Sequence, residues 1–302
     1  MVLKRFFILC FVIFFIQISA FSQLLDANQP LFKEDPFFNK KFIKTNQIKS
    51  IKGSWSSKKV KDIIRKKNVD FYYEFNREGM LTQQYSTFLT QQVKKDTSII
   101  AYTYNKQNQI IVKRKTDNKG FFSLRYQYDN NGNLKKETYA REENGGASIK
   151  EFDLKREFII KTDSFHVEQL SEKQEKTTFY NGYGKSYKEE FKYFDDLGFL
   201  VEVYTKFLIG NKKSKITLAY DELGRLRQRI TIENLNLPTE KKEVFLYDDV
   251  GNLIEIKAYE NEDYKTSTQF LYDKNMLLTA QLTKEIVTEF ITIIQYEYGF
   301  YE

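Results

Sequence analysis

The stretch YDELGRL at residues 220–226 carries the clearest structural signal in this chain of 302 residues, because variants of it recur along the sequence. The shared phrase is Tyr or Phe, then Asp or Asn, two free positions, usually Gly, one free position, and Leu or Ile. Seven copies occur: FNREGML from Phe75, YNKQNQI from Tyr104, YDNNGNL from Tyr128, FDDLGFL from Phe194, YDELGRL from Tyr220, YDDVGNL from Tyr247 and YDKNMLL from Tyr272. Neighbouring copies lie 24 to 29 residues apart, with one gap of 66, so the chain is a repeat array.

Each copy has the chemistry of a tight hairpin turn. Asp or Asn at the second position can bond its own backbone two residues on, and Gly at the fifth position supplies a positive φ. Gly occupies the fifth position in five copies, at Gly79, Gly132, Gly198, Gly224 and Gly251. Asn108 is the next best residue for a left-handed conformation. Met276 breaks the rule and predicts a looser or differently built turn.

The residues that flank the copies alternate between apolar and polar. After the copy at 220–226, for example, Leu226 and Ile230 oppose Arg227 and Arg229. Alternation on both sides of a turn predicts an antiparallel hairpin with one buried face. We therefore predict an all-β fold: a long, twisted antiparallel meander of repeated hairpins, curled, with about 14 to 16 strands. The seven copies should lie at hairpin tips along one edge.

The gap of 66 residues predicts further, degenerate units. FDLKREF from Phe152 preserves the spacing, with Arg156 in the Gly position and Phe158 in the Leu position. FYNGYG at residues 179–184 predicts another chain reversal.

The phrase resembles the YD repeat of the Rhs family, whose consensus core is YDxxGRL. Residues 220–226 match this core outright, and the resemblance extends in degenerate form over roughly residues 71 to 300. Large Rhs proteins coil such strands into a shell around a toxin. The resemblance implies a strongly twisted antiparallel sheet here, but this chain shows no toxin, no self-cleaving aspartate module and too few repeats to enclose one. A structural or assembly role related to Rhs shells is one alternative function.

The first 22 residues have the pattern of a signal peptide. Lys4 and Arg5 precede an apolar run over residues 6–18, and AFS at 20–22 predicts cleavage before Gln23. A retained anchor is disfavoured because a membrane span needs roughly 20 apolar residues. Cleavage also removes Cys10, the only cysteine, so disulfides are excluded. We expect export to the periplasm, the cell surface or the medium, with no integral membrane span after processing.

Positive charge gathers near the start of the exported chain. Residues 39–68 hold eleven Lys or Arg against Asp62 alone. We expect a basic arm over residues 23–70, with a possible short helix through Val60, Ile63 and Ile64, followed by a repeat domain over residues 71–302. The candidate electrostatic contacts are Lys58, Lys59, Lys61, Arg65, Lys66 and Lys67, for an anionic envelope polymer, a lipid surface or a protein partner. The alternative is a solvated edge that prevents unwanted strand pairing. Nucleic acid is disfavoured by export.

The sequence shows no pattern of catalytic residues. His166 is the only histidine and no cysteine remains after processing, which argues against a metal site. GYGKS at 182–186 ends like a phosphate-binding loop, but Phe179 stands where the leading Gly is required. No cofactor motif is present. Paired carboxylates for glycan hydrolysis are the least favoured alternative. Charges interrupt the strands, which disfavours an outer-membrane barrel. We therefore predict a non-enzymatic binding or scaffolding protein of a bacterial cell envelope.

Overall fold

The computed structural model describes residues 23–25, 38–89, 95–117, 120–146 and 153–302, so the expected signal peptide lies outside the described residues. Within them the chain forms one short helix and eighteen strands. The elements are α2 (Lys40–Thr45), β1 (Ile48–Lys59), β2 (Arg65–Phe75), β3 (Leu81–Leu89), β4 (Lys95–Tyr104), β5 (Ile110–Asp117), β6 (Gly120–Tyr128), β7 (Leu134–Asn144), β8 (Leu154–Ser171), β9 (Gln174–Tyr180), β10 (Ser186–Phe194), β11 (Leu200–Phe207), β12 (Lys213–Tyr220), β13 (Leu226–Ile232), β14 (Lys241–Tyr247), β15 (Leu253–Glu260), β16 (Asp263–Tyr272), β17 (Leu278–Glu285) and β18 (Phe290–Phe300).

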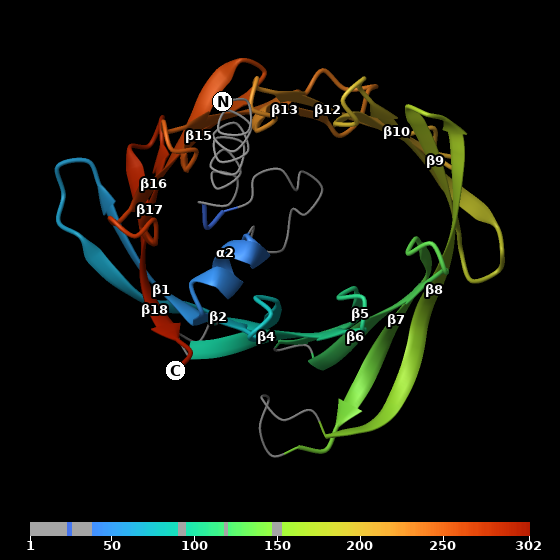
Figure 1. The fold of residues 1–302 in the computed structure, drawn as a ribbon, viewed down its shortest axis with the longest axis horizontal. Helices are drawn as coiled ribbons and strands as arrows, with labels where there is room; N and C mark the ends of the chain where they lie inside the picture. Colours follow the sequence, from blue (N-terminus) through green and yellow to red (C-terminus); the bar gives the residue numbers. More distant parts are fainter. Residues whose placement is uncertain (1–22, 26–37, 90–94, 118–119, 147–152) are drawn as a thin grey trace, which may run out of the picture.

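The strands form a closed barrel. Each pairs antiparallel with its neighbour in sequence, and β1 also pairs with β18, from Ile48 opposite Phe300 to Lys59 opposite Phe290. Figure 1 looks down this ring, with α2 inside it. The predicted antiparallel meander is confirmed. The sheet closes rather than only curling, however, and it has more strands than expected. The wall begins at Ile48, inside the segment expected to be a separate arm.

The two ends of the barrel differ in their turns. All seven copies of the phrase join an even-numbered strand to the next odd-numbered one, so in an up-and-down barrel they lie at one end, here called the phrase end. The odd-to-even connections lie at the other end, here called the basic end because the β1–β2 hairpin, with its Lys and Arg residues between positions 58 and 67, reaches it.

The phrase turns share one hydrogen-bond pattern. In the copy at 220–226, Oδ1 of Asp221 accepts from the backbone N–H of Leu223 at 3.0 Å and of Arg225 at 2.9 Å. The N–H of Gly224 donates to the Asp221 carbonyl, and its φ of 73° is one that side chains disfavour. The five phrase glycines all have φ between 73° and 97°. Met276 was expected to loosen its turn, but it adopts φ 63° and keeps the same bonds.

The long gap holds one further turn of this kind. Asn181 accepts from the N–H groups of Tyr183 and Lys185, and Gly184 has φ 70°. The reversal expected there is present, at the basic end between β9 and β10. FDLKREF, expected as a degenerate copy, forms no turn at its described residues: Arg156 and Phe158 lie within strand β8, and Phe152 lies outside the described residues.

A series of tyrosines ties each hairpin to the one before it. The hydroxyl of Tyr220 donates to the carbonyl of Leu200 at 2.9 Å, and that of Tyr247 donates to Leu226 at 2.8 Å. The same link joins Tyr104 to Leu81, Tyr128 to Ile110, Tyr272 to Leu253 and Tyr298 to Leu278. Burial raises the pKa of Tyr220, so this phenol keeps the proton that it donates.

A register irregularity beside each of these turns changes which side chains face inward. Leu226 packs in the core, and Arg229, three residues later, lines an internal cavity. Ile230 was expected on the same face as Leu226, with Arg229 opposite. The pairing of β12 with β13 shifts between Ala219 and Tyr220, and such a bulge moves the following residues to the other face. The predicted inward Ile230 is therefore wrong.

The apolar core fills the phrase end of the barrel. Leu24, Phe42 and Ile43 enter it from the N-terminal segment and α2, and they pack against the wall residues Leu226 and Leu253. A helix of six residues is not stable alone, so these contacts hold α2 in place. No helix among the described residues is long and apolar enough to span a membrane.

Candidate functional site

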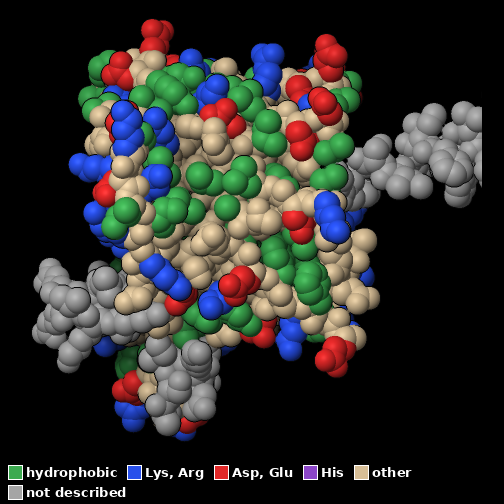
Figure 2. Space-filling view, turned by 90° about the vertical axis from the view of Figure 1, so that its left-hand side faces the viewer, with side chains coloured by type: hydrophobic (Ala, Val, Ile, Leu, Met, Phe, Trp, Pro, Cys, Tyr) green, Lys and Arg blue, Asp and Glu red, His purple; other side chains and the backbone are tan. Residues whose placement is uncertain are grey.

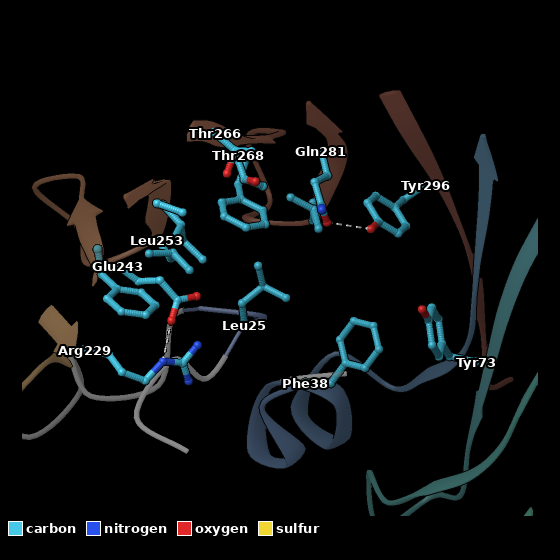
Figure 3. Close-up of a pocket in the computed structure, with 15 residues that line it drawn as sticks. Leu25, Phe38, Tyr73, Arg229, Glu243, Leu253, Thr266, Thr268, Gln281 and Tyr296 are labelled. Atoms are coloured by element: carbon cyan, nitrogen blue, oxygen red, sulfur yellow. Dashed lines mark hydrogen bonds and ion pairs between the residues drawn. The ribbon is translucent and has the colours of Figure 1, made fainter. Parts of the chain in front are cut away.

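An apolar cavity of about 370 Å³ lies inside the barrel, next to the core. Figure 3 shows Leu25 and Phe38, from the N-terminal segment, facing Leu253 and Tyr73 on the wall. Phe38 packs edge-to-face on Tyr73, with ring centroids 5.0 Å apart. Burial raises the pKa of Tyr73 to about 12, so its phenol is neutral at physiological pH. The volume lies within the usual range for small-molecule sites.

A second cavity, of about 570 Å³, continues from the first. Both are lined by Arg229, Glu243, Ala258 and Thr266. The second also reaches residues beside the β13–β14 and β15–β16 connections, namely Glu233, Lys241, Glu260 and Lys265. These connections belong to the basic end. The lumen on this side therefore runs from an apolar chamber near α2 to a charged mouth at the basic end.

An ion pair marks the junction of the two cavities. Nε of Arg229 donates to Oε2 of Glu243 at 2.6 Å, and the Arg229 side chain is 11% exposed (Figure 3). The guanidinium also lies near the ring of Phe245, at 5.9 Å from its centroid. Deeper in, the hydroxyl of Tyr296 donates to Gln281 at 3.2 Å. Sequence reasoning missed this pair because the bulge at Leu226 reverses the expected orientation of Arg229.

The opposite wall carries an ionisable cluster. Buried Asp163 accepts from the hydroxyl of Tyr187 at 2.8 Å and pairs with Lys161 at 2.5 Å. Burial, and then the nearby Asp163 carboxylate, raise the pKa of Glu137. Burial lowers the pKa of Lys188, whose ammonium stands 3.5 Å from the centroid of Phe179. Positive and negative side chains alternate here, and Lys161 and Tyr187 both bond the Asp163 carboxylate, which is typical of a structural network.

The six sequence-predicted basic residues lie together in one hairpin. Lys58 and Lys59 end β1, Lys61 lies in the turn, and Arg65 to Lys67 begin β2. No helix forms at Val60, Ile63 and Ile64, because β1 and β2 pair up to this turn. In Figure 1 the β1–β2 hairpin reaches beyond the barrel wall, in blue at the left. Within the described residues, Arg65 is the one member with an ion pair, to Asp62, whose pKa its side-chain hydrogen bond lowers.

The tip of this hairpin is apolar. Ile63 is 70% exposed and Ile64 is 61% exposed, between the cations of the two strands. Other connections at the basic end also carry exposed apolar side chains: Val287 after β17, Ile209 after β11, Leu237 after β13 and Tyr183 after β9. Exposed apolar side chains also occur at the phrase end, at Leu197, Leu223 and Val250, but there they follow the acidic pairs Asp195-Asp196, Asp221-Glu222 and Asp248-Asp249.

The outer wall mixes charged and apolar side chains. Figure 2 shows basic, acidic and hydrophobic side chains interspersed over one outer face. Paired strand residues point to the same face, which places the ion pairs Lys176–Glu189 (2.8 Å) and Lys215–Glu202 (2.6 Å) on the outside. Such charges stand where a lipid-exposed barrel carries an apolar band.

Among the described residues, no group of three His, Cys, Asp or Glu is arranged to hold a metal ion. His166, on β8, belongs to no such group among the described residues.

Comparisons with known proteins find only distant structural similarities. No family model matches the sequence, and no curated protein matches it. Among solved structures, a porin-like protein from Bacteroides uniformis is 12% identical, covering 83% of this chain and 98% of its own, with a TM-score of 0.43. A porin-like protein from Bacteroides vulgatus is 10% identical, covering 70% of this chain and 96% of its own (TM-score 0.29). A LolA superfamily protein from Nitrosomonas europaea is 8% identical, covering 85% and 87% (TM-score 0.20). Identities and scores this low carry no functional argument.

Proposed function

We propose that this protein is an exported, non-enzymatic β-barrel of a bacterial cell envelope that docks on an anionic lipid surface through its β1–β2 hairpin. The observation that carries the proposal is the hairpin tip, where exposed Ile63 and Ile64 stand among six cations. Apolar side chains of this kind enter the headgroup region while neighbouring Lys and Arg contact lipid phosphates.

The outer wall supports docking on the membrane surface rather than insertion. Ion pairs such as Lys215–Glu202 would have to be desolvated in hydrocarbon, at a cost of several kcal/mol per ion. The acidic turns make the phrase end a poor partner for anionic lipid. Charge complementarity therefore selects the basic end for the contact.

Vesicle sedimentation tests the docking. The protein should bind phosphatidylcholine vesicles that contain phosphatidylglycerol and should bind pure phosphatidylcholine weakly. Each basic residue near an anionic leaflet contributes about 1 kcal/mol, so replacing Lys58, Lys59, Lys61, Arg65, Lys66 and Lys67 by Gln should abolish binding. High salt should weaken binding by the parent protein, because screening acts within about 10 Å.

Two double variants distinguish a specific role of the hairpin tip in vesicle binding from a general effect of exposed apolar side chains. Ile63→Ser with Ile64→Ser should reduce vesicle binding, whereas Leu223→Ser with Val250→Ser, at the phrase end, should leave it unchanged. If the six-Gln variant binds as well as the parent protein, the hairpin is a solubility device and the proposal fails.

Export is tested by the intact mass of the protein recovered from the envelope. Cleavage before Gln23 gives a chain that begins at that residue. A cytoplasmic protein that retains Met1 contradicts export.

A further inference from the structure

The two connected cavities form a graded path through one side of the lumen. The inner chamber is walled by Phe38, Phe245, Phe270 and Ile256, and the outer chamber by Lys241, Lys265 and the acidic residues beside them. Apolar side chains form most of the lining of the inner chamber, and apolar cavities favour apolar occupants. The outer chamber, in contrast, suits a charged or strongly hydrated group.

The inner chamber is closed at its far side. Leu24, Phe42 and Ile43 are buried in the core that fills the phrase end. Leu25 and Phe38, which pair with each other through a β-bridge, form the chamber's own boundary on that side. An occupant therefore enters from the basic end and places its apolar part inward.

Arg229, at the junction of the two cavities, determines which charge the bound molecule should carry. Arg229 is held by its Nε bond to Glu243, and a guanidinium has five N–H donors in a planar fork that suits carboxylate and phosphate. The lining of the second cavity also includes Lys241 and Lys265, with the acidic residues Glu233, Glu243 and Glu260. The planar fork of Arg229 therefore favours an anionic group at the junction.

We infer that the lumen binds a single-chain amphiphile, with its hydrocarbon chain in the inner cavity and its anionic head group at Arg229. The mouth lies at the basic end, the same end as the hairpin proposed to dock on lipid. Only the membrane as the source of the occupant rests on that proposed function, because docking would turn the mouth toward the membrane. The site itself depends only on the lumen.

Fluorescence of cis-parinaric acid, a polyene fatty acid, tests the site with the purified protein in the absence of vesicles. We expect saturable binding. Ala258 lines both cavities, so Ala258→Phe should block the path and weaken binding at least tenfold. Ala280 lies on β17 next to the cavity-lining Gln281 and so faces outward. Ala280→Phe is therefore the matched control and should change affinity less than twofold. Thermal melting confirms that each variant is folded, and Ala258→Leu replaces Ala258→Phe if the larger residue prevents folding.

The head group is tested with the acid and its methyl ester. Arg229→Gln should weaken binding of the acid at least fivefold and leave the ester unchanged. Glu243→Gln removes the competing carboxylate and should strengthen binding of the acid. Equal losses in Ala258→Phe and Ala280→Phe, or no loss in either, overturn the lumenal site. Equal effects of Arg229→Gln on acid and ester overturn the anionic head group.

The same measurements separate this inference from the proposed membrane docking. The six-Gln hairpin variant should lose vesicle binding and keep its affinity for parinaric acid. Failure of vesicle binding by the parent protein, together with normal parinaric acid binding, refutes the docking and leaves the lumenal site standing. Vesicle binding without saturable parinaric acid binding refutes the lumenal site alone.

Discussion

At the scale of the residue, the five phrase glycines share a conformation but differ in their surroundings. A Cβ added to Gly79 would lie 2.3 Å from the carbonyl oxygen of Lys40 and 2.9 Å from the backbone nitrogen of Lys44. A Cβ added to Gly251 would meet only the end of the Arg225 side chain, at 3.7 Å. The β2–β3 turn is thus a docking surface for α2, which Lys44 reinforces with an ion pair to Glu78 at 2.5 Å.

This difference predicts unequal costs for the same substitution. Gly251→Ala should lower the free energy of unfolding by about 1 kcal/mol, because Ala is strained at positive φ. Gly79→Ala should cost clearly more, because the new methyl group also collides with the backbone of α2. Urea unfolding measures both. Equal losses in the two variants would contradict the docking of α2 on this turn.

At the scale of the element, the sequence predicted the hairpins, and it predicted the inward side chains correctly before the turn at 220–226 but not after the bulge beside it. The phrase places Asp or Asn and Gly where a turn requires them, and the eighth turn at residues 181–185 follows the same rule. The bulge beside Leu226 is a property of strand pairing that simple apolar–polar alternation does not take into account. A simple alternation therefore assigned Arg229 to the wrong face and missed the lumenal site.

The tyrosine series predicts a link between neighbouring hairpins. Tyr247→Phe removes the donor to the Leu226 carbonyl and should cost about 1 to 2 kcal/mol of unfolding free energy. Tyr180 begins the turn at the basic end and is outside this series, so Tyr180→Phe is the matched control and should be nearly neutral. The urea midpoints of the two variants provide the comparison. A neutral Tyr247→Phe would show that the series contributes little to stability.

At the scale of the whole molecule, the sequence predicted a meander but not its closure. Closure depends on the register between β1 and β18, which lie at opposite ends of the barrel sequence. The basic hairpin could be found from the sequence because Lys58 to Lys67 are close along the chain. The lumenal site could not, because Phe38, Arg229 and Tyr296 meet only when the ring closes.

The pairing of β1 with β18, which closes the barrel, also affects how the chain folds. β1 is the first wall strand to be synthesised, but Ile48 can pair with Phe300 only after the other strands of the barrel have been synthesised. Bringing such distant segments together has a high entropic cost and is slow. Until then β1 presents an unpaired edge, which could capture the edge of another chain. Its exposed Lys49, Lys52 and Lys59 oppose that capture, since charge discourages edge-to-edge association. Part of the positive charge at the start of the barrel thus protects an intermediate that no longer exists once the protein has folded.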